Sequence, residues 1–157
     1  MIKVIIYLLL SFILDGVLSL YLTHNLLNPL LTITSLIVIY RLFEREEKLY
    51  FIIVMIMGLL FDIFYTDTLI LNLFVFFLLG LFIKFMNIYL ANNFMSFVVK
   101  FLLGITCYRL ITYIILSLVN YKAFDIMILL TSIYSSIIIN LIYLIISYFI
   151  FKKEKEF

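Results

Sequence analysis

Long apolar segments, each bounded by a short polar turn, follow one another along the chain. The segments cover about residues 2–22, 30–43, 49–65, 69–90, 97–118 and 124–151. Most reach about twenty residues, which is the helix length that crosses a hydrocarbon core about 30 Å thick. They lack the alternation of apolar and polar residues that membrane barrel strands need. The sequence therefore predicts a single all-α integral membrane domain over 1–157, a bundle of six transmembrane helices with short loops.

The composition supports this prediction and excludes several classes of protein. Hydrophobic residues make up 68% of the chain and charged residues 13%, whereas soluble domains are about half apolar and about a quarter charged. The net charge of +2 gives no sign of nucleic-acid binding. The only cysteine, Cys107, permits no intrachain disulfide and suggests no metal cluster.

Basic residues predict the orientation of the bundle. If the N-terminus is cytoplasmic, the outer side receives only Lys122, and Arg109 lies inside a segment. The cytoplasmic side then receives Lys3, Arg41, Arg45, Lys48, Lys84, Lys100, Lys152, Lys153 and Lys155. The positive-inside rule favours this arrangement, with both termini cytoplasmic. The first apolar segment has no small-residue cleavage site, so we expect a retained helix rather than a signal peptide.

A carboxylate interrupts the third apolar segment. Asp62 lies about 5 Å from the outer end of that segment, at about 1.5 Å per helical residue, and Asn72 lies at a similar depth in the next one. The two residues flank one outer hairpin, so a hydrogen bond between them is expected. A carboxylate in a hydrocarbon-length segment costs a few kcal/mol and usually faces other helices or water. Its role is either functional or a polar contact between packed helices.

Two further charges lie inside apolar segments. By the same rise per residue, Asp15 is about 10 Å and Arg109 about 13 Å below the outer ends of their segments. Because these depths match, Arg109 is expected to pair with Asp15 in preference to Asp62, as an unpaired buried charge is costly. This buried charge network either serves a function or only fixes the register of the helices.

The residues that enzymes need are missing from the pattern. The single histidine excludes a histidine-pair zinc site, and four glycines and one proline provide no phosphate-binding loop. The two buried acids, Asp15 and Asp62, differ in depth, which argues against a carboxylate-pair protease. The sequence predicts no enzyme, no cofactor and no metal site.

The run Gly58-Leu59-Leu60-x-Asp62, followed by Leu69-x-Leu71-Asn72, resembles the MreD family of bacterial rod-shape-determining membrane proteins. The family pattern reads roughly Gly-Leu-x-x-Asp, a spacer, then Leu-Gly-x-Asn. Gly58, Asp62, Leu69 and Asn72 match it, and Ile70 stands where the family usually has glycine. This departure predicts a looser backbone approach at the outer hairpin.

The resemblance implies a function and a set of partners. It implies a non-catalytic scaffold of the cell-elongation and peptidoglycan synthesis machinery, in the bacterial cytoplasmic membrane. It implies binding to MreC, a bitopic membrane protein, and proximity to RodA-type glycosyltransferases and class B penicillin-binding proteins. It also implies a place near the MreB cytoskeleton, in cells that have one.

The competing interpretation is a substrate-binding subunit of an energy-coupling-factor vitamin transporter. Such subunits are also small six-helix bundles, and the MreD family is distantly similar to them. The polar residues in the outer half of the predicted bundle would then line a vitamin pocket. Two features argue against this interpretation. Alanine is scarce and the small alanine-based coupling motifs are missing. The outer loops also have few polar, aromatic or glycine residues.

Overall fold

The computed structural model describes residues 2–22, 28–66, 70–91, 93–119 and 125–152, and these ranges contain helices and no strands. The elements are α1 (Ile2–Leu22), α2 (Leu31–Ile39), the 3-10 turn η2 (Tyr40–Leu42), α3 (Glu47–Phe64), α4 (Leu71–Tyr89), α5 (Phe94–Leu118) and α6 (Ile126–Lys152). The predicted all-α fold and its count of six helices are confirmed for this part of the chain. The predicted helix starts at residues 69 and 124 lie outside the described residues.

Four of the helices found in the described ranges, α1, α4, α5 and α6, are long and apolar enough to cross a membrane. The 18-residue helix α3 also contains Glu47, Lys48 and Asp62. Large apolar side chains are exposed on all the helices around α2, for example Leu20, Ile63 and Ile88. A water-soluble monomer rarely exposes so much apolar surface.

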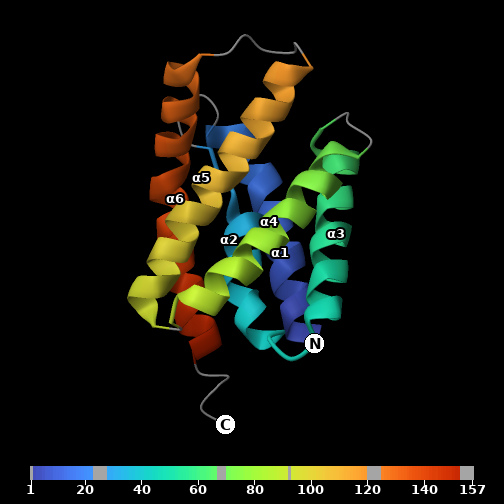
Figure 1. Cartoon of the computed structure of the whole chain (residues 1–157), viewed down its shortest axis with the longest axis vertical. Coiled ribbons are helices and arrows are strands. Elements are labelled where there is room, and N and C mark those ends of the chain that lie inside the picture. Colours follow the sequence, from blue (N-terminus) through green and yellow to red (C-terminus); the bar gives the residue numbers. More distant parts are fainter. Residues whose placement is uncertain (1, 23–27, 67–69, 92, 120–124, 153–157) are drawn as a thin grey trace.

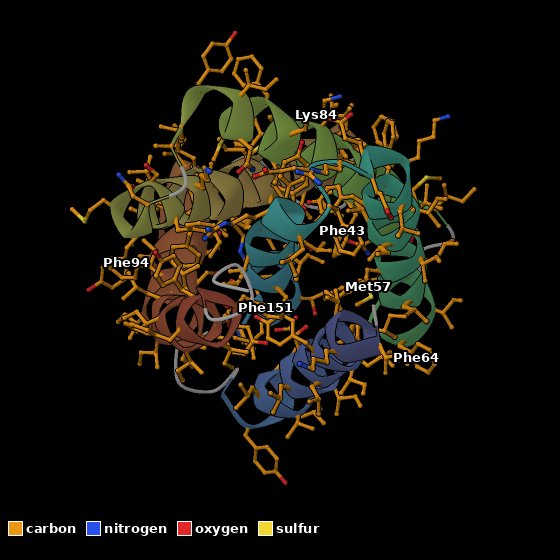
Figure 2. The ribbon with its side chains drawn as sticks, turned by 90° about the horizontal axis from the view of Figure 1, so that it is seen from below. Phe43, Met57, Phe64, Lys84, Phe94 and Phe151 are labelled. Atoms are coloured by element: carbon orange, nitrogen blue, oxygen red, sulfur yellow. The ribbon has the colours of Figure 1, made fainter. Side chains whose placement is uncertain are left out.

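Helix α2 lies at the centre of the bundle, with the other helices around it (Figure 2). All nine of its residues are buried, and it packs against α1, α5 and α6. The sequence Leu31–Ile39 has no charged residue, and apolar residues outnumber its three hydroxyl residues, as in helices enclosed by a protein core. Its hydroxyl groups partly bond their own helix: Thr34 Oγ1 donates to Leu30 O at 3.1 Å, and Ser35 Oγ donates to Leu31 O at 2.9 Å.

The predicted span 30–43 is not one continuous α-helix. It comprises a nine-residue α-helix and a three-residue 3-10 turn. At about 1.5 Å per residue, α2 is about 14 Å long, or about half of a hydrocarbon core. One of its ends must therefore lie inside the bundle. The backbone groups at that end need polar partners from neighbouring helices.

Helix α1 begins, and α6 ends, at the same end of the molecule (Figure 1). Helices α3 and α5 also begin there, and α4 ends there. We call this end the basic end, since the element ends gathered there carry Lys3, Arg41, Arg45, Lys48 and Lys84. Five of the nine cations that the sequence assigned to one side thus belong to this end of the molecule. Lys122, Lys153 and Lys155 lie outside the described residues.

Some charges near the basic end hold the helices together. Lys84 Nζ on α4 lies 2.6 Å from Glu47 Oε2 on α3. Lys100 on α5 is only 1% exposed, and its ammonium group donates to Asn87 Oδ1 at 2.7 Å and lies 5.1 Å from the centre of the Phe97 ring. Lys100, which the sequence assigned to the cytoplasmic side, is therefore a buried packing residue.

Candidate functional site

The carboxylate of Asp62 caps the start of the next helix. Its Oδ1 accepts hydrogen bonds from Asn72 N at 2.9 Å and Asn72 Nδ2 at 3.1 Å, and its Oδ2 accepts from Leu73 N at 3.0 Å. The N-cap residue of α4, Ile70, has no side chain that can cap. The first N–H groups of a helix lack partners within it and favour a negative charge. The expected hydrogen bond between Asp62 and Asn72 is confirmed.

Gly58 brings the backbones of α3 and α4 together beside this cap. A Cβ atom on Gly58 would lie 2.7 Å from Leu73 Cα and 2.8 Å from Asn72 O, closer than real Cβ contacts. The expectation of a looser approach, based on Ile70, is therefore wrong, because the glycine on α3 provides the space. Gly58, Asp62 and Asn72 form one contact, whereas Leu69 lies outside the described residues.

The carboxylate of Asp15 caps the start of α2, as that of Asp62 caps the start of α4. Its Oδ1 accepts from Leu31 N at 2.6 Å, and its Oδ2 accepts from Thr32 N at 2.8 Å. The N-cap residue of α2, Leu30, likewise has no capping side chain. Asp15 is 5% exposed, so its charge sits against the positive end of a buried helix. In both hairpins, a carboxylate near the end of one helix stabilises the start of the following helix.

The structure does not join Arg109 to either buried acid, so the expected ion pair between Arg109 and Asp15 is wrong. Arg109 Nε and Nη2 donate instead to Ser136 Oγ on α6, at 3.1 Å and 2.7 Å. The carboxylates of Asp15 and Asp62 accept hydrogen bonds from backbone N–H groups at helix starts instead. Arg109 and Asp15 still attract each other through space. Matching depth in the bundle was not enough to bring the two groups into contact.

Helix α6 provides further polar partners for the buried start of α2. Asn140 Oδ1 accepts from Leu30 N at 2.8 Å, and Asn140 Nδ2 donates to Ser136 O at 2.5 Å. Asn28 Nδ2 donates to Ser135 Oγ at 3.1 Å. The role of Asn140 was not predicted from the sequence. Its signal was an amide deep in an apolar run, with Ser136 one turn away on the same face.

A tyrosine connects α3 to α1 near Asp15. Tyr65 Oη donates to Phe12 O at 2.5 Å, and the rings of the two residues are 4.7 Å apart. A Cβ atom on Gly16 would lie 2.5 Å from Tyr65 Oη, so the missing side chain at Gly16 leaves room for this contact. The helices that carry the two capping acids are thus joined to each other.

Some polar groups in this region remain without partners. Thr32 Oγ1 and Thr112 Oγ1 are buried and make no hydrogen bond to the described residues. Only the Nε and Nη2 atoms of Arg109 have acceptors in the same part of the chain. The arrangement can therefore fix the starts of two helices, and it still offers hydrogen-bond donors to a further group.

Comparison of the chain with models of known protein families, with characterised proteins and with solved structures finds no match.

Proposed function

We propose that this chain is a multi-pass protein of the bacterial cytoplasmic membrane with both termini in the cytoplasm. The proposal is supported by four long apolar helices and by the apolar side chains exposed around the bundle. The basic end gathers Lys3, Arg41, Arg45, Lys48 and Lys84. Such an excess of cations on one side is typical of the cytoplasmic face.

Within that membrane, we propose a non-catalytic scaffold that binds an MreC-like bitopic partner of the cell-elongation machinery. RodA-type glycosyltransferases and class B penicillin-binding proteins would then act nearby. One observation carries the proposal: Gly58, Asp62 and Asn72, on which the resemblance to the MreD family rests, converge on one contact between α3 and α4. The motif therefore has a physical task, which is to fix the geometry of this hairpin.

The burial of these residues defines how they would act on a partner. Asp62 is 4% exposed and Asn72 is 2% exposed, so neither presents its polar group to another protein. They would act by holding α3 and α4 in the shape that the partner recognises. Helix association in lipid depends on such close packing of surfaces.

Co-purification tests this proposal. The chain is expressed with the MreC-like protein of the same cell, and the tagged partner is isolated in mild detergent. The wild-type chain is expected to co-purify with it, and the exposed-site variant Glu46→Gln is expected to do so equally well. Asp62→Asn is expected to lower the amount of folded chain and the recovered complex together. A wild-type chain that fails to accompany the partner would refute the scaffold.

One observation favours the second candidate, a substrate-binding subunit of a transporter. Arg109 lies in the interior with donors to spare, as a small-molecule site would require. Tight binding of a water-soluble vitamin by the purified chain, together with indifference to the MreC-like protein, would favour this function over the scaffold.

A further inference from the structure

Arg109 has more hydrogen-bond donors than the protein uses. A guanidinium group carries five N–H bonds in a rigid fork, yet its Nε and Nη2 atoms share one acceptor, Ser136 Oγ. Its Nη1 atom has no acceptor within the described ranges. Each nitrogen atom of Arg109 either has an acceptor or is partly exposed. The Nη1 donors therefore face space that a ligand or water can reach.

The positive charge of Arg109 also lacks a carboxylate in contact. Both oxygens of Asp15, the acid whose charge acts on Arg109, accept hydrogen bonds from backbone N–H groups of α2. Ser136, the only acceptor that the described residues give Arg109, is a neutral hydroxyl that is itself fully buried. A cation inside an apolar bundle is usually retained because it faces an anion or a water-filled path. The described residues supply no anion in contact with it.

The donors that remain on Arg109 suit one class of ligand. A guanidinium is suited to the oxygen atoms of a phosphate or carboxylate, which it often binds in a bidentate manner. Thr112, one turn further along α5, adds no donor, because its Oγ1 atom is enclosed and a ligand cannot reach it.

We propose that the guanidinium of Arg109 binds an oxyanion, a phosphate or a carboxylate, through its unused Nη1 donors. The anion belongs either to the headgroup of an acidic lipid or to a water-soluble ligand. The inference rests on the membrane placement proposed above and is independent of the MreC-like partner. A purely structural Arg109 would join α5 to α6 through Ser136 and would bind no anion.

The test uses the full chain, purified in a neutral detergent. Native mass spectrometry measures the retention of phosphatidylglycerol against phosphatidylcholine, which tests the lipid source. Thermal unfolding with pyrophosphate or citrate tests the water-soluble source. The wild-type chain is expected to prefer the acidic lipid or to be stabilised by one of the soluble anions.

Variants assign that binding to Arg109. Arg109→Gln keeps a donor for Ser136 but removes the charge, and it is expected to weaken anion binding by about tenfold or more. Arg109→Lys keeps the charge but loses the guanidinium fork, and it is expected to retain only part of the binding. Arg45→Gln is the matched control, because Arg45 is an exposed arginine at the basic end, and its binding is expected to equal that of wild type.

Three results would overturn the inference. The first is a wild-type chain that binds neither the acidic lipid nor a soluble anion in preference to the neutral lipid. The second is anion binding that is unchanged in Arg109→Gln. If that variant does not fold, equal anion affinity of Arg109→Lys and wild type is the third, because the guanidinium fork would then contribute nothing. None of these results involves the MreC-like protein, so the failure of one proposal is distinguishable from the failure of the other.

Discussion

Asp62 on α3 accepts a hydrogen bond from the backbone nitrogen of Asn72 on α4 at 2.9 Å. The side chain of one helix thereby supplies the cap that the next helix lacks. Asp15 repeats this relationship with Leu31 at the start of α2. The two acids that are buried in the described ranges, Asp15 and Asp62, both stabilise the start of a helix. In an apolar environment, such N–H groups have no water to replace these partners.

Replacing Asp62 by asparagine is expected to destabilise the chain by about 1–3 kcal/mol. The amide retains one acceptor oxygen but places an NH₂ group against the N–H of Asn72 or Leu73, and the charge that favours the helix start is lost. Thermal unfolding in detergent measures the effect. Asp125→Asn is the control, since Asp125 lies directly before α6, accepts from Met127 N and is exposed, and it should lose less stability. Equal losses would show that burial does not strengthen the Asp62 cap.

Gly58→Ala is expected to destabilise the chain by about 1–3 kcal/mol, because the new methyl group would press on the backbone of Leu73. Gly80→Ala is the matched control on the partner helix. There the nearest atoms are side-chain atoms of Phe51 and Val54 at 3.3 Å, which can move. Melting temperatures of the two variants check the difference. A Gly58→Ala protein as stable as Gly80→Ala would contradict the close approach of α3 and α4.

A double-mutant cycle examines the separation of Asp15 and Arg109. Asp15→Asn and Arg109→Gln remove groups with different contacts, so their effects on the free energy of unfolding are expected to be nearly additive. Only the through-space attraction of the two charges would couple them. Denaturation of both single variants and the double variant measures this coupling. A double variant clearly more stable than either single variant would indicate a direct ion pair instead.

Reporter fusions test the orientation. A protein that fluoresces only in the cytoplasm, fused after Phe157, is expected to be bright, because the basic end faces inward. The same reporter placed in the polar segment at residues 120–124 is expected to be dark. The reversed pattern would place the basic end outside and would exclude the orientation proposed here.

The sequence by itself determined the helices and the polar contact of one hairpin. Helix formation and apolar exposure follow from local runs of residues, which are read directly along the chain. Asp62 and Asn72 are only ten residues apart and flank one tight turn, so their depth alone was enough to bring them together. The resemblance of this stretch to a family motif pointed to the same residues.

Only the tertiary structure decided the remaining partners. Depth along a helix specifies how far a side chain lies from the end, but not its direction around the axis or the neighbouring helix. The sequence therefore matched Arg109 with Asp15, whereas lateral packing gave Arg109 the hydroxyl of Ser136, 27 residues away. Packing also enclosed the short helix α2 and turned its start toward Asp15, 16 residues before Leu31. A buried helix start requires polar partners, and the arrangement of helices around it determines which ones it obtains.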